Sequence, residues 1–101
     1  MERLAVIARL KPGAEVPAAE LIAAGPPFDA EQSGFQRHSI YLAADEVVFV
    51  FEGHKVESLI DKLIDDPFHW MLREAIEQWT PLLDGSPRIA SEKFFWESSE
   101  A

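Results

Sequence analysis

Three histidines are the side chains of this sequence best suited to acid–base chemistry near neutral pH. They are His38, His54 and His69, and histidine exchanges protons near pH 7 without needing a special environment. His38 falls in the middle of a predicted strand, where Glu52 or Arg9 on a neighbouring strand would have to act as its partner. His38 is therefore the candidate catalytic residue. A hydrogen-bonded, inert histidine at a strand edge or subunit seam is the alternative.

Several other polar and aromatic side chains are candidates for contact with a small ligand. Glu52 and His54 are two residues apart, so an extended strand would direct both to the same side. His69 and Trp70 fall beside the apolar stripe of a predicted helix, where an aromatic residue marks either a cleft rim or a protein interface. The candidate ligand-binding residues are Arg9, Tyr41, Glu52, His54, His69, Trp70 and Trp96.

Many other chemistries lack the residues they need. The sequence has no cysteine, and no HxH, HxxxH or carboxylate cluster supplies a third metal ligand, so we expect neither a metal nor a cofactor. The motifs GxSxG, GxGxxG and the P-loop are also missing, which argues against serine hydrolases and nucleotide-binding enzymes.

Charge and hydropathy exclude two classes of partner. Eighteen acidic and nine basic residues give a net charge of −9, which repels nucleic acid and anionic membranes. No run approaches the roughly 20 apolar residues of a membrane-spanning helix. The charged start Met1-Glu2-Arg3 does not resemble a signal peptide, so we expect a cytoplasmic protein.

Periodicity predicts a single domain over residues 1–97, followed by a short tail over 98–101. Alternating apolar residues predict strands over 3–10, 35–43, 46–52 and 88–97. Helical spacing predicts a short helix over 16–24 and a longer run over 56–83. Asp66 as a cap and Pro67 at the first helical position divide this longer run in two. Residues 28–33 are expected to form an ordered connecting loop.

The element order βαββαβ is typical of a ferredoxin-like α+β fold, with a four-stranded antiparallel sheet and helices on one face. The first and third strands are apolar on both sides, so the second sheet face must be covered. We expect a homodimer in which an identical sheet covers it, forming an α+β barrel. Sheet aromatics would either fill the core or form a surface for an apolar or aromatic ligand. They are Tyr41, Phe49, Phe51, Phe94 and Trp96.

Four segments resemble the dimeric α+β barrel superfamily, and within it the L-rhamnose mutarotase-like family comes closest. They are Arg9-Leu10-Lys11-Pro12-Gly13, Ser39-Ile40-Tyr41-Leu42, Phe49-Val50-Phe51-Glu52 and Asp84-Gly85-Ser86-Pro87. The resemblance implies the dimeric barrel and a sugar mutarotase activity. This chain lacks the family's catalytic Tyr and His on the first helix and its Trp pair on the second, where only Trp70 is near.

Three functional hypotheses follow from the sequence. The first is a dimer that binds a small apolar or aromatic metabolite between sheet and helices, with cofactor-free chemistry at His38. The second is a non-catalytic structural or interaction dimer. The third is a divergent sugar mutarotase-like protein, which requires a polar cleft. Whether the protein is an enzyme stays open at this stage.

Overall fold

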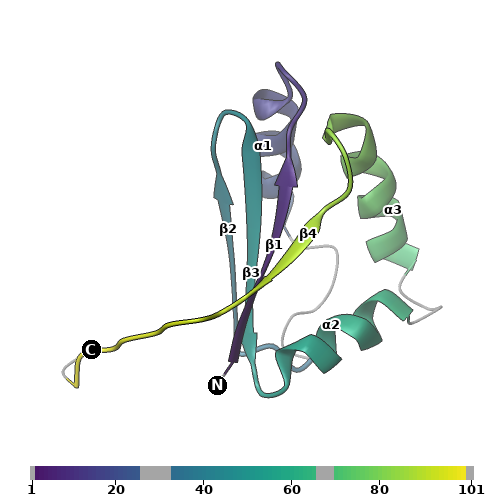
Figure 1. The fold of residues 1–101 in the computed structure, drawn as a ribbon. Helices are drawn as coiled ribbons and strands as arrows, with labels where there is room; N and C mark the ends of the chain where they lie inside the picture. The colour runs from purple at the N-terminus through teal and green to yellow at the C-terminus, as the bar shows by residue number, and fades with distance from the viewer. Residues whose placement is uncertain (1, 26–32, 66–69, 100–101) are drawn as a thin grey trace.

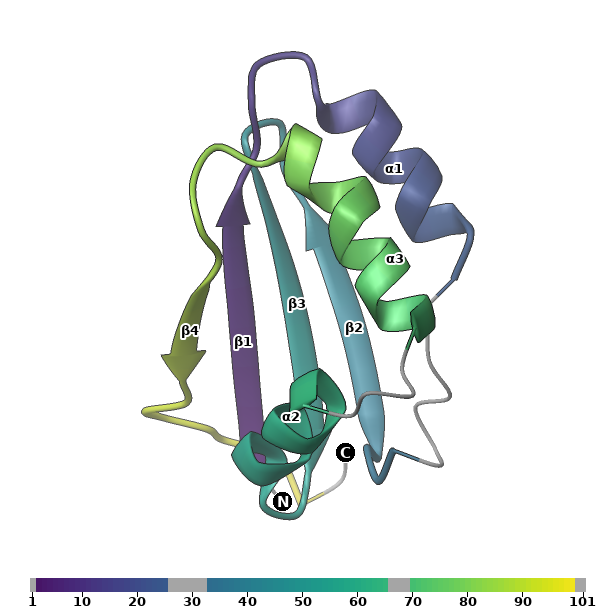
Figure 2. The same ribbon diagram turned by 90° about the vertical axis from the view of Figure 1, so that its right-hand side faces the viewer.

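The computed structural model describes residues 2–25, 33–65 and 70–99 (Figure 1). Its four strands form one antiparallel sheet in the order β2-β3-β1-β4. The helices lie on one side of this sheet (Figures 1 and 2). The elements are β1 (Glu2–Arg9), α1 (Glu15–Ala23), β2 (Arg37–Leu42), β3 (Glu46–Gly53), α2 (Val56–Asp65), α3 (Trp70–Trp79), the short 3-10 helix η1 (Thr80–Leu82) and β4 (Arg88–Ser91). The predicted ferredoxin-like βαββαβ fold is therefore confirmed.

Side chains alternate between the two faces of the sheet. In the central strand pair, Leu4 lies opposite Phe51 and Ala8 lies opposite Val47, and these four residues are buried beneath the helices. We call this side the helix face. The residues between them, such as Ile7 opposite Val48, point to the other side, which we call the open face.

Two apolar clusters fill the space between the helix face and the helices. α2 contributes to the first cluster and α1 to the second, while the indole ring of Trp79 in α3 packs edge-on against Phe49, with 5.4 Å between ring centroids. The first cluster contains Leu4, Phe35, Phe51, Val56 and Ile60. The second contains Ala8, Leu10, Ala14, Ala18 and Val47. The helix face is thus the core of the subunit.

The last strand is shorter than the sequence predicts. β4 ends at Ser91, whereas alternation predicted a strand to Glu97. The register pairs Ser91 with Leu4, and β1 begins at Glu2, so at most two further residues could have continued the β1–β4 ladder. The prediction that Phe94 and Trp96 line the sheet is therefore wrong, because both lie beyond the strand and are exposed.

The other predicted boundaries agree with the structure to within about two residues. The long helical run is divided, since α2 ends at Asp65 and α3 begins at Trp70. The predicted cap Asp66 and Pro67 lie outside the described residues, as does nearly all of the predicted loop over 28–33. None of the helices in the described ranges is both long and apolar enough to span a membrane.

Candidate functional site

His38 lies on β2 and points to the helix face. It is half-buried and lies opposite Phe51 in the β2–β3 register. The imidazole and the Phe51 ring are stacked, with 4.4 Å between centroids and an interplanar angle of 20°. The Phe35 ring packs against the same Phe51 ring, with 5.0 Å between their centroids. His38 is thus a polar side chain set on an aromatic surface at the margin of the core.

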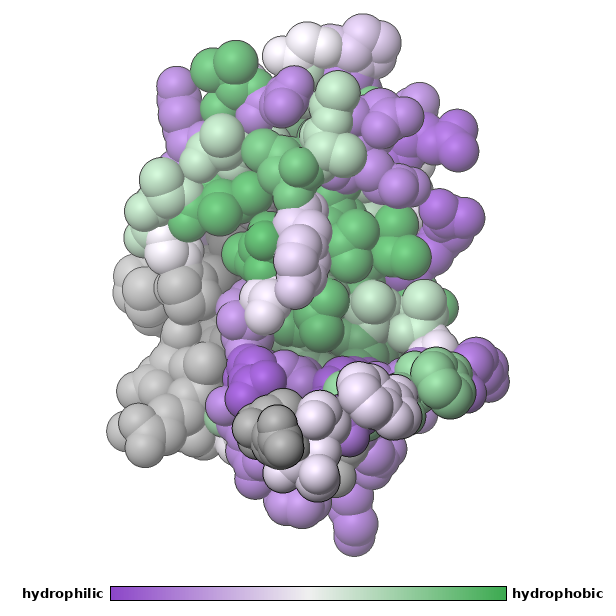
Figure 3. Space-filling view, turned by 90° about the vertical axis from the view of Figure 1, so that its left-hand side faces the viewer, coloured by the Kyte–Doolittle hydropathy of each residue, from purple (hydrophilic) through white to green (hydrophobic). Residues whose placement is uncertain are grey.

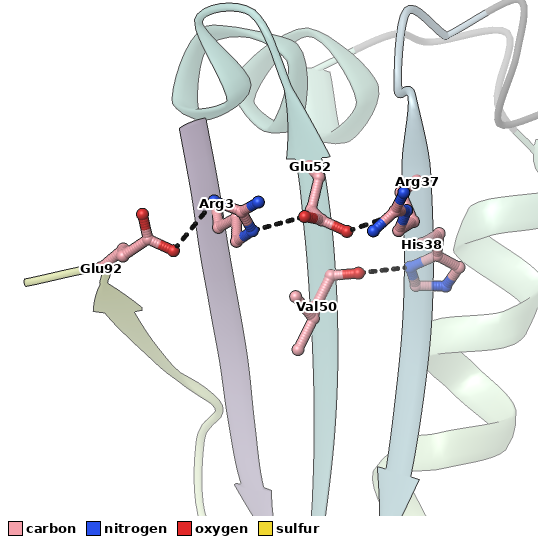
Figure 4. A network of polar contacts seen from close by, with 6 residues as sticks. All are labelled: Arg3, Arg37, His38, Val50, Glu52 and Glu92. Carbon is pink, nitrogen blue, oxygen red and sulfur yellow. Dashed lines mark hydrogen bonds and ion pairs between the residues drawn. The ribbon is translucent and has the colours of Figure 1, made fainter. Parts of the chain in front are cut away.

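A backbone hydrogen bond determines which nitrogen of His38 can do acid–base chemistry. Nδ1 lies 2.9 Å from the carbonyl oxygen of Val50 (Figure 4). A carbonyl oxygen only accepts, so Nδ1 carries the hydrogen and donates it. In the neutral ring the lone pair is therefore on Nε2, which is the atom that can take up a proton.

Glu52 does not serve as the predicted partner of His38, because it points to the open face. Its side chain forms ion pairs with Arg3 on β1 and, at 3.6 Å, with Arg37 on β2 (Figure 4). The residue is 5% exposed, so a carboxylate is held in the sheet by two guanidinium groups. Arg9 also points to the open face, since it lies opposite Glu46 on β3. Both predicted partners are wrong for the same reason, which is the alternation of strand residues.

Three of the other predicted ligand-binding residues, Tyr41, His54 and Trp96, do not lie on the helix face beside His38. Tyr41 is on the open face and is 62% exposed. His54 is exposed in the turn between β3 and α2, beyond the strand that contains Glu52, so the strand spacing assumed for the two residues does not apply. Trp96 is exposed beyond β4. Trp70 is the first residue of α3, while its side chain and all of His69 lie outside the described residues.

Arg3 is central to this network, and the sequence did not single it out. It faces Glu52 directly across the β1–β3 ladder, and its guanidinium also lies 3.4 Å from a carboxylate oxygen of Glu92. At the other end of the open face, Arg88 pairs with Glu46 at 3.7 Å. The sequence could have indicated Arg3 only through opposite charges at facing positions of neighbouring strands, and this pattern can be recognised only when the strand register is known.

Within the described ranges, no three acidic or histidine residues come together as metal ligands.

Comparisons with known proteins identify the fold. Neither a scan against protein-family models nor a search of curated proteins finds a match. Among solved structures, the chain is similar to tetracenomycin F2 cyclase from Streptomyces glaucescens, a type-II polyketide cyclase, with a TM-score of 0.68 and 15% identity over 95% of this chain and 97% of that chain.

Two further solved structures share the arrangement. An antibiotic biosynthesis monooxygenase matches with a TM-score of 0.65 and 11% identity, over 94% of this chain and 99% of that one. A nipsnap family protein of unknown function from Agrobacterium tumefaciens matches with a TM-score of 0.61 and 17% identity, over 95% and 91% of the two chains. Identities this low are evidence of a shared fold and not of a shared activity. The chain therefore has the ferredoxin-like α+β fold that these proteins also have.

Proposed function

We propose that this chain forms a homodimer in which each subunit binds a small apolar or aromatic molecule on the helix face of its sheet, beside His38. The observation that carries this proposal is the setting of His38. Its ring is stacked on Phe51, and its Nδ1 hydrogen is committed to Val50. Ligand sites are typically apolar surfaces with a few oriented polar groups, and this arrangement has that character.

His38 would act as an acid–base group that needs no cofactor. Nε2 accepts a proton from an acidic C–H or O–H of the ligand, and the resulting imidazolium returns the proton to a different atom of the same molecule. No electrons leave the ligand, so the step needs no redox partner. A correctly placed acid–base group of this kind accelerates a reaction by roughly 10²- to 10⁴-fold. The names of two similar structures, a polyketide cyclase and an antibiotic biosynthesis monooxygenase, support a small organic metabolite as the ligand.

The two alternative functions rest on different observations. A dimer without catalysis is favoured by the distribution of charged residues, because Glu52 and Arg9 lie on the face opposite His38. A sugar mutarotase requires a polar cleft, whereas the ring stacked on His38 belongs to Phe51, which packs in turn against Phe35. We therefore prefer an apolar or aromatic ligand to a sugar.

The open face supports the homodimer. Its centre is formed by Ala5, Ile7, Val48 and Val50, which no element of the described chain covers, and apolar surface runs along the middle of this face with hydrophilic residues above and below it (Figure 3). Uncovered apolar sheet faces are characteristic of protein interfaces, and two-fold homodimers are the commonest assemblies. Light scattering is expected to give about twice the chain mass of 11.4 kDa.

Thermal unfolding in the presence of candidate ligands tests the binding proposal. The panel contains sugars, haem and polycyclic phenols. A ligand present at 100 times its dissociation constant stabilises the native state by about 2.7 kcal/mol, which raises the melting temperature of a domain this small by roughly 10 °C or more. We expect the phenols to produce the rise. A rise with sugars alone would favour the mutarotase alternative, and no rise with any class would contradict the proposed ligand.

The variant His38→Phe separates catalysis from binding. Phenylalanine keeps a ring on Phe51 but has no Nε2, so we expect ligand affinity to change less than fivefold while turnover of an identified substrate falls at least 100-fold. His54→Phe is the matched control, because His54 is exposed in a turn, and it should leave turnover unchanged. If His38→Phe retains full turnover, His38 has no catalytic role.

A further inference from the structure

Residues 92–97, which we call the aromatic arm, leave the sheet after β4. The arm runs away from the helices, toward the side of the open face (Figure 1). Its three aromatic residues are exposed, with 83% of Phe94, 47% of Phe95 and 72% of Trp96 accessible to solvent. Three adjacent exposed aromatic residues are unusual on a subunit that functions alone, and they indicate a surface that contacts another protein.

The root of the arm is held by Arg3 and is not a loose tail. The guanidinium of Arg3 lies 3.4 Å from the centroid of the Phe95 ring, which is a cation–π contact. The same guanidinium pairs with Glu92 and with the buried carboxylate of Glu52. The position of Arg3 is therefore set by the sheet, and Arg3 in turn sets the direction in which the arm leaves it. Phe94 and Trp96 flank Phe95 in the chain, so in an extended segment they point to the side opposite the ring that Arg3 holds.

The charge of the open face favours a second copy of this chain as the partner. Although the chain carries a net charge of −9, the sheet residues that point to this face include four arginines and two glutamates, a net charge of +2. They are Arg3, Arg9, Arg37, Arg88, Glu46 and Glu52. In the arm, Glu92 is paired with Arg3 of its own subunit, and the charges of Lys93 and Glu97 cancel. The open face and the arm therefore do not share the negative charge of the whole chain, so two copies can meet there without the like-charge repulsion that the rest of the surface would cause.

The apolar area of the arm is large enough to contribute substantially to a dimer interface. An aromatic side chain buries roughly 150–250 Å², so Phe94 and Trp96 together supply on the order of 300–500 Å². A stable interface of standard size buries about 800 Å² on each partner. The arm would thus account for a major share of the contact.

We propose that the aromatic arm of each subunit clasps the other subunit of a homodimer, with Phe94 and Trp96 packed against the partner's open face. This inference rests on the homodimer proposed above and adds the element that holds it together. Two-fold symmetry makes the contact reciprocal, so both arms and both open faces are used.

Sedimentation equilibrium of arm variants tests the clasp. In the double variant Phe94→Ser/Trp96→Ser, we expect the dimer dissociation constant to rise at least 100-fold, while the circular dichroism of the subunit is unchanged because the arm is outside the sheet. Val16→Ser is the matched control. Val16 is an apolar residue that is 67% exposed on α1, on the helix side of the molecule, and its replacement should change the dissociation constant less than threefold.

Chymotrypsin provides a second readout on the unmodified protein, since it cleaves after Phe94, Phe95 and Trp96. At protein concentrations above the dimer dissociation constant, we expect cleavage in the arm to be at least tenfold slower than at concentrations below it. A wild-type protein that stays monomeric at all concentrations would overturn both the homodimer and the clasp. A dimer that is equally stable in the double variant, with an arm cleaved at the same rate at every concentration, would overturn the clasp alone.

Discussion

At the scale of single residues, Glu52 is the clearest case of a side chain whose charge is structurally required. Its carboxylate is buried between Arg3 and Arg37, and the side chain is 7% exposed. Replacing Glu52 with Gln keeps the shape and removes the charge, which leaves two guanidinium groups beside a neutral amide. We expect Glu52→Gln to lower the free energy of unfolding by about 1–3 kcal/mol, measured by urea denaturation.

Glu46→Gln is the matched control for this prediction. Glu46 is on the same strand and face and also pairs with an arginine, Arg88, but the two side chains are 40% and 68% exposed. Exposed ion pairs contribute little, so its loss should change stability by less than about 0.5 kcal/mol. Equal effects of the two substitutions would show that burial of the Glu52 network does not contribute to stability.

At the scale of elements, the turn that leads into β2 depends on close packing against α2. Gly34 has a φ of +92°, and a Cβ atom placed on it would lie 3.0 Å from Cδ2 of Leu59 in α2. The variant Gly34→Ala therefore adds both backbone strain and a steric conflict. We expect it to lower the free energy of unfolding by more than about 2 kcal/mol in urea denaturation.

Gly85→Ala isolates the backbone contribution. Gly85 has a similar φ of +97° in the turn before β4, but nothing lies within 4 Å of its added Cβ atom. We expect Gly85→Ala to lower the free energy of unfolding by about 1–2 kcal/mol, because only the left-handed backbone conformation is unfavourable for alanine there. If Gly34→Ala costs no more than Gly85→Ala, Leu59 can move aside and α2 is not closely packed on this turn.

At the scale of the whole molecule, the open face must be apolar at its centre for two sheets to stack. Val48 lies between Ile7 and Tyr41 across the sheet, so Val48→Asp would place an unpaired carboxylate in the proposed interface. We expect the dimer dissociation constant to rise at least 100-fold, which is ~2.8 kcal/mol at 1.4 kcal/mol per tenfold change. Light scattering across a dilution series measures this change.

Val16→Asp serves as the control, because it adds the same charge to an exposed residue on α1. The Val16→Asp protein should have the same mass in light scattering as the wild-type protein. A stable dimer also makes the urea midpoint of the wild-type protein rise with protein concentration, since dimerisation stabilises the native state by mass action. A dimeric mass for Val48→Asp would show that the open face is not the interface, and a urea midpoint that is independent of concentration would contradict the dimer itself.

The amino-acid sequence alone determined which residues of each strand share a face and which stretches are helical. Alternation in β1 and β3 separates Leu4 and Phe51 from Ala5 and Val50, and the division of the long helical run was also predictable. These features are local, because the periods of two and 3.6 residues are properties of the backbone itself. The ferredoxin-like fold followed from the order of the elements.

Only the tertiary structure decided how the strands line up and where pairing stops. His38 and Glu52 point to opposite faces because the β2–β3 register pairs Glu52 with Arg37, and a shift of one residue would have reversed this. The residues after Ser91 have strand-like alternation, yet they leave the sheet, and only two residues of β1 lie beyond Leu4 to pair with them. Pairing requires a second strand at the right place, so side-chain pattern along one segment cannot specify it.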